Sequence, residues 1–126
     1  MNKERLLMVA DAIERNQRFD MLGFFLIPGL LGRHLVISRP EMSDISNIEE
    51  AIIDAGNVPC GTTCCIAGEA ALLSGRTHGA ASDVAQEWLE LDDDEAINLF
   101  YGEWSTKCMS AITAEEAVAH LRELAR

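Results

Sequence analysis

The beginning of the chain carries apolar residues at helical spacing. Within residues 3–15 the spacing is i, i+3, i+4 and i+7, and charged residues occupy most of the positions between. The apolar positions are Leu6, Val9, Ala10 and Ile13. This pattern predicts an amphipathic helix that buries one face.

Residues 18–40 are also apolar, but they follow neither the helical nor the strand period. Four residues interrupt them: Gly23, Pro28, Gly29 and Gly32. Interruptions of this kind are typical of turns. We therefore expect either a short hairpin within 22–40, with 34–38 as one strand, or a loop laid over the core.

The middle of the chain predicts two further helices, each with hydroxyl or carboxylate side chains before its apolar residues. Such side chains cap helices by accepting hydrogen bonds from the first backbone N–H groups. The first of these helices ends near residue 55 and is capped by Ser43 or Asp44; the second ends at residue 74 and is capped by Thr62 or Thr63.

Three more helices are predicted after residue 80. The first starts at Ser82 or Asp83. The second starts at Asp92, where four consecutive carboxylates favour a helix N-terminus because of the helix dipole. The third starts at Thr113, which has the spacing of a capping box with Glu116. Their predicted buried stripes are Val84, Ala85, Trp88 and Leu89; then Ala96, Leu99 and Phe100; then Ala117, Val118, Leu121 and Leu124.

Together these segments predict an all-α fold, a compact helical bundle of about five to six helices joined by short links. The 126 residues fit a single domain, 1–126, with one core of ordinary size. The N-terminal residues are charged throughout, and the most apolar run, 21–31, is too short to span a bilayer. We therefore expect a cytoplasmic protein without a membrane segment.

Charge is distributed very unevenly along the chain. The formal net charge is -11, and between Pro40 and Thr106 fourteen residues are acidic while only Arg76 is basic. Direct binding to nucleic acid is therefore not expected, because it requires Lys and Arg to replace the counterions of the phosphates.

The densest acidic cluster lies where the fourth predicted helix gives way to the fifth: Glu87, Glu90, Asp92, Asp93, Asp94 and Glu95. One interpretation is a solvated face that keeps the protein soluble. The other is a charge mimic that meets the basic groove of a nucleic-acid-binding protein, with electrostatic steering of their association. We take the second as the hypothesis for function and these six residues as the partner-binding surface.

Three of the four cysteines lie close together, at Cys60, Cys64 and Cys65. A structural zinc site is usually formed by four Cys or His ligands in two closely spaced pairs. Cys60 and Cys64 could form one pair, but the sequence contains no second pair. A reactive thiol is the second interpretation, because Cys64 or Cys65 would lie in the first turn of a helix. The third, which we favour, is core packing, because small apolar residues follow and predict a central helix buried almost all round.

The stretch CGTTCCIAGEA at 60–70 resembles the CGTxxCIAGxA signature of small, functionally uncharacterised proteins of bacteria and phages. The likeness continues at 18–21, 99–104 and 112–118. The chain departs from the pattern at Glu69, where an aromatic is common, and in the length of 22–59. The resemblance implies no activity and no catalytic residues, but it makes a phage or mobile-element origin plausible.

These observations predict a small acidic binding protein without enzymatic activity or cofactor. Its expected partner is a basic nucleic-acid-binding host protein, as for an anti-defence protein of the anti-CRISPR type. The alternative is a small thiol- or zinc-dependent enzyme or sensor that uses Cys60, Cys64 and Cys65. The apolar segment 22–31 is a candidate homodimer face or part of the core.

Overall fold

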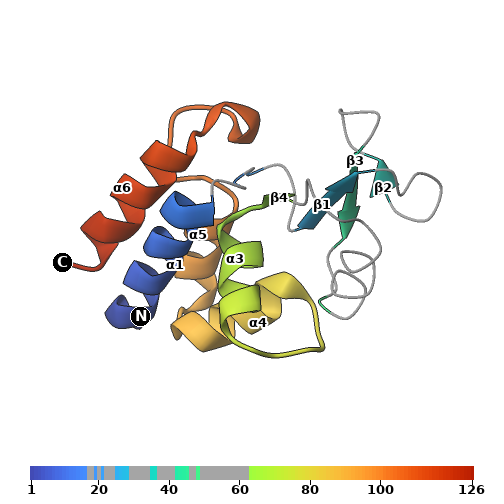
Figure 1. Ribbon diagram of the computed structural model, residues 1–126. Coiled ribbons are helices and arrows are strands. Elements are labelled where there is room, and N and C mark those ends of the chain that lie inside the picture. The colour runs from blue at the N-terminus through green and yellow to red at the C-terminus, as the bar shows by residue number, and fades with distance from the viewer. Residues whose placement is uncertain are drawn as a thin grey trace.

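The computed structural model describes residues 1–16, 19, 21, 25–28, 35–36, 42–45, 48 and 63–126. This part of the chain contains five α-helices (Figure 1): α1 (Lys3–Asn16), α3 (Ile66–Leu73), α4 (Ala81–Leu89), α5 (Asp93–Phe100) and α6 (Ala114–Leu124). A 3₁₀ turn, Met109–Ala111, precedes α6. The prediction of a compact, helical fold is confirmed for these elements; the single-domain organisation stays a prediction.

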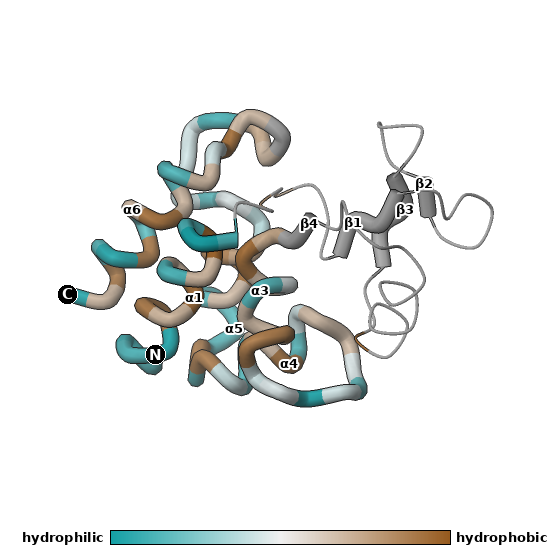
Figure 2. Tube along the Cα trace, in the orientation of Figure 1, coloured by the Kyte–Doolittle hydropathy of each residue, from teal (hydrophilic) through white to brown (hydrophobic). Residues whose placement is uncertain are grey.

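Helix α3 is the centre of the helical body. It packs against α1, α4 and α5, while α1 packs along α6. Every residue from Cys65 to Ala71 is buried, and even the Glu69 side chain is only 1% exposed. The predicted central helix is therefore confirmed. In Figure 2 the tube changes from brown at the end of α3 to teal in the loop before α4, where the chain returns to solvent.

The apolar faces predicted from the spacing are those that form the core. Leu6, Val9 and Ile13 of α1 are buried, and so are the predicted residues of α5. In α4 and α6 the residues predicted to be buried are buried as well, except for Trp88 and Leu124, which are partly buried against the core.

A small antiparallel sheet lies to one side of the helices (Figure 1). Its strands, described by their backbone, are β1 (Phe25–Pro28), β2 (Leu35–Val36), β3 (Met42–Ile45) and β4 (Thr63–Cys64), in the order β2-β3-β1-β4. The sequence allowed a short hairpin or a loop within 22–40. Instead β1 and β2 each pair with β3, so the sheet extends beyond that range.

The predicted helix start at Ser43 or Asp44 is wrong. Both residues lie in β3, where Ser43 pairs with Ile27 and Asp44 with Leu26 of β1. Pairing with two neighbouring strands outweighs the local preference of these residues for a helix cap, because sheet context decides strand formation. Ile45 also lies in β3, Ile48 is helical and buried, and the remaining positions of the predicted helix lie outside the described residues.

The predicted cap of α3 is also wrong. Thr63 lies in β4, and the N-cap is Cys65, whose Sγ accepts a hydrogen bond from the Gly68 N–H at 3.5 Å. The sequence pointed to a hydroxyl because oxygen is the usual acceptor at this position. Helix α4 begins at Ala81, one residue before Ser82, the earlier of the two predicted starts, and its N-cap Ala80 makes no side-chain hydrogen bond to the helix.

Candidate partner-binding surface

Helices α4 and α5 and the turn after them carry charge of one sign. Residues 82–104 contain eight acidic residues and no Lys, Arg or His. Seven of the eight are exposed and Glu95 is half-buried. We call these eight residues the acidic surface: Asp83, Glu87, Glu90, Asp92, Asp93, Asp94, Glu95 and Glu103. It includes all six residues predicted from the sequence.

Some of these carboxylates hold the N-terminus of α5. Asp92 Oδ1 accepts a hydrogen bond from the Glu95 N–H at 2.8 Å, and Glu95 Oε2 accepts one from the Asp92 N–H at 2.9 Å. This capping box satisfies backbone donors that have no partner within the helix. Asp93 Oδ1 accepts a hydrogen bond from Gln86 Nε2 at 2.8 Å, which ties α5 to α4.

Two other carboxylates, Glu87 and Glu90, form hydrogen bonds with residues outside the acidic surface. Both guanidinium nitrogens of Arg76 donate to Glu87, at 3.0 and 3.1 Å, and these hydrogen bonds lower the pKa of Glu87 below its usual range. Glu90 has left-handed backbone geometry, with φ of 58°, and its Oε2 accepts a hydrogen bond from Asn2 Nδ2 at 2.6 Å. Glu87 is therefore paired with a cation, and Glu90 joins the end of α4 to the residue before α1.

Three carboxylates remain available to a partner. Asp83, Asp94 and Glu103 are exposed, and none of them forms a side-chain hydrogen bond or an ion pair within the described part of the chain. Sequence analysis named Asp94 but missed Asp83 and Glu103. Both stand outside the dense run of acids in the sequence, and the packing of α4 against α5 brings Asp83 to the same groove as Asp93.

A shallow groove of about 280 Å³ lies between α4 and α5. Its lining residues are Ser82, Asp83, Gln86, Asp93, Ala96, Ile97, Phe100 and Tyr101. Ile97 is 47% exposed and Tyr101 is 50% exposed, while Ala96 and Phe100 beneath them are buried. The acidic surface therefore contains an apolar hollow, which the charge pattern alone did not reveal.

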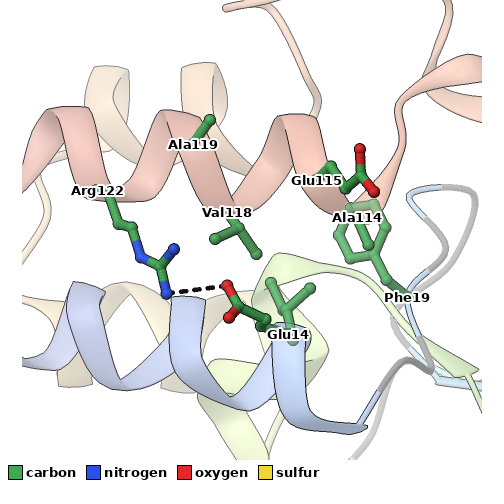
Figure 3. A pocket seen from close by; sticks show the side chains of 8 residues that line it. Glu14, Phe19, Ala114, Glu115, Val118, Ala119 and Arg122 are labelled. Atoms are coloured by element: carbon green, nitrogen blue, oxygen red, sulfur yellow. Dashed lines mark ion pairs between the residues drawn. The ribbon is translucent and has the colours of Figure 1, made fainter.

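A larger cleft of about 660 Å³ lies between α1 and α6 (Figure 3). Ile13, Val118 and Phe19 give it an apolar side, and Arg122 crosses it to pair with Glu14 at 2.9 Å and with Asp11 at 3.2 Å. Two carboxylates balance this one cation, so the cleft does not favour an anion. Its described lining contains no Ser, Thr, Cys, His or Lys, and its ionisable side chains are Glu14, Glu115 and Arg122.

The cysteines do not form a site within the described residues. The Cys65 side chain is 2% exposed, Cys108 is exposed, only the backbone of Cys64 is described, and Cys60 lies outside the described residues. No three metal-ligating side chains come together in the described part of the chain. Core packing is confirmed for Cys65, and the thiol- or zinc-dependent alternative stays a prediction.

The Trp104 and His120 rings stack, with centroids 4.3 Å apart and an interplanar angle of 10°. Trp104 Nε1 donates to the Leu99 carbonyl at 3.2 Å, so the ring is fixed from α5 while His120 projects from α6. His120 Nε2 is buried and has no hydrogen-bond partner among the described residues. Burial lowers the pKa of His120, and the charge of Glu123 opposes this shift. We treat the pair as a packing contact between elements.

Comparison with protein-family models gave no match. Comparisons with curated proteins and with solved structures gave none either. Among the described helices, none combines the length and apolar character needed to cross a membrane. The assignment of the acidic surface therefore rests on the geometry of the described residues alone.

Proposed function

We propose that the protein works by binding, without catalysis, and that its acidic surface captures a basic nucleic-acid-binding protein of a host cell. The observation that carries this proposal is the run from 82 to 104, with eight acidic residues and no basic one, almost all exposed. Clustered charge of one sign speeds association with an oppositely charged partner and repels nucleic acid itself.

The positions of these carboxylates support charge mimicry. They lie on two adjacent helices and the turns beside them, so a partner that normally binds phosphates would meet several negative charges along α4 and α5. Among known modes of action, this fits an inhibitor of the anti-CRISPR or another anti-defence type, encoded by a phage or mobile element. The resemblance of residues 60–70 to small phage and bacterial proteins favours the same origin.

Affinity capture tests the proposal with a matched pair of variants. The immobilised protein is exposed to host lysate, and captured proteins are identified by mass spectrometry. The test variant is Asp83→Asn with Asp94→Asn, and the control is Glu4→Gln with Glu115→Gln. All four residues are exposed carboxylates in the first turn of a helix, so each variant loses two charges of the same structural kind.

We expect the parent and the control to capture the same basic protein and the test variant to capture much less of it. Capture of an acidic or neutral protein, or equal capture by all three, would show that the acidic surface is a solvated face. Circular dichroism of each variant checks that the fold is retained.

A further inference from the structure

The groove between α4 and α5 combines apolar anchors with acidic edges. Ile97 lies on α5 and Tyr101 is the C-cap of that helix, and the Tyr101 N–H donates to the Ile97 carbonyl at 3.1 Å, so the two residues lie one turn from each other. A single exposed apolar residue needs no explanation, whereas two that flank a hollow form a patch suited to a partner.

The charges around this hollow have one sign. Asp83 of α4 and Asp93 of α5 are on its lining, and the described lining contains no basic residue. Of the two, Asp93 is engaged by Gln86, while Asp83 has no such contact among the described residues. The complementary ligand therefore carries an apolar side chain with cationic side chains next to it.

The size of the groove decides between a small molecule and a protein segment. Small-molecule sites usually enclose roughly 300 to 1,000 Å³, and this groove, at about 280 Å³, is open and shallow. It has room for one or two side chains. The eight residues of α5 rise about 12 Å, or roughly two turns, which matches the apolar face of a short helix laid across it.

We infer that this groove docks a basic amphipathic helix of the partner, with an apolar side chain inserted between Ile97 and Tyr101. The inference rests on the proposed function and adds the class of segment that is recognised. The carboxylates of the acidic surface then set the rate of association, and the apolar contact slows dissociation.

The test uses two synthetic peptides of about 14 residues, both made of the same numbers of Leu and Lys. In one, Leu recurs at i, i+3, i+4 and i+7; in the other, the same residues are scrambled so that no apolar face exists. Binding of each labelled peptide is measured by fluorescence anisotropy at low salt and at about 300 mM salt, where surface attraction is strongly screened.

Two variants separate the groove from other exposed apolar positions. Ile97→Ala with Tyr101→Ala removes the anchors and keeps a good helix former. Leu7→Ala with Met8→Ala is the control, because these α1 side chains are 41% and 44% exposed and do not line the groove.

We expect the parent and the control to bind the amphipathic peptide about tenfold more tightly than the scrambled one at the higher salt, as one buried apolar anchor can provide. The Ile97→Ala, Tyr101→Ala variant should lose this preference. If both peptides bind equally well and their binding weakens as salt rises, the inference that the groove docks an amphipathic helix is wrong. The proposed function would not be affected by that result. No binding of either peptide at low salt would count against both.

Discussion

Asp92 and Glu95 exchange hydrogen bonds across the first turn of α5, so two members of the acidic surface hold a helix end. Glu87 is paired with Arg76, and Glu90 accepts a hydrogen bond from Asn2. A run of acids that looks uniform in the sequence therefore contains two groups. One group stabilises the fold, and the other, with Asp83 and Asp94, is available to a partner.

The first prediction concerns the capping role of Asp92. Asp92→Ala should lower the free energy of unfolding by about 1 kcal/mol, because it removes the acceptor for the Glu95 N–H. Asp92→Asn should lose much less, since the amide oxygen still accepts that hydrogen bond. Urea denaturation of the two variants measures the difference. Equal free energies of unfolding for the two variants would mean that the hydrogen bond to the Asp92 side chain does not stabilise the protein.

The second prediction uses two glycines with nearly the same φ angle. Gly75 and Gly102 have φ of 75° and 73°. A Cβ at Gly75 would meet no atom within 4 Å, whereas one at Gly102 would lie 2.8 Å from Cδ1 of the buried Ile112. Gly75→Ala should cost about 1 to 2 kcal/mol for the left-handed conformation alone. Gly102→Ala should cost more, because Ile112 must move.

The comparison of the two glycine variants is made by thermal and urea denaturation. The excess loss in Gly102→Ala measures how tightly the turn after α5 packs on the segment before α6. Identical losses would contradict the packing described for this turn.

The third prediction concerns pH. Burial lowers the pKa of His120 below its ordinary value of 6.5, so the unfolded chain takes up this proton more readily than the folded protein does. The contribution of neutral His120 to stability is therefore complete above pH 6.5 and is lost as the pH falls below that value.

Phenylalanine at this position provides the matched variant. His120→Phe keeps an aromatic ring to stack on Trp104 and removes both the titrating group and the unpartnered Nε2. Relative to the parent, the variant should become more stable as the pH is lowered from 7.5 to 5.5. Stability profiles that run parallel over this range would show that His120 is not the sensitive group.

The sequence predicted those elements whose signals are local. The helix start at Asp92, the capping box at Thr113, and the apolar stripes of α1 and α5 depend on residues within one or two turns, and they lie where they were expected. Of the strands, β2 lies inside the strand expected at 34–38, whereas β3 and β4 were assigned to a helix start and a helix cap. Residues 42–45 form β3 because they pair with strands elsewhere in the chain, and a local pattern carries no information on that pairing.

The candidate site was predicted in part for a similar reason. A run of acids is visible in any sequence, so Asp94 was identified. The groove was not, because Ile97 stands beside the core residues Ala96, Leu99 and Phe100, and its hydrophobicity alone suggests burial. Only the packing of α4 against α5 leaves Ile97 and Tyr101 exposed next to Asp83.

The central claim is that the unpaired carboxylates of the acidic surface attract the partner over a distance. The most direct measurement is the association rate constant with the captured partner as a function of salt, for the parent, for Asp83→Asn with Asp94→Asn, and for Glu4→Gln with Glu115→Gln. Steered association slows steeply as salt rises. We predict a slower rate and a shallower salt dependence for the Asn variant, with the control equal to the parent. Rates that coincide for all three proteins at low salt would contradict the claim.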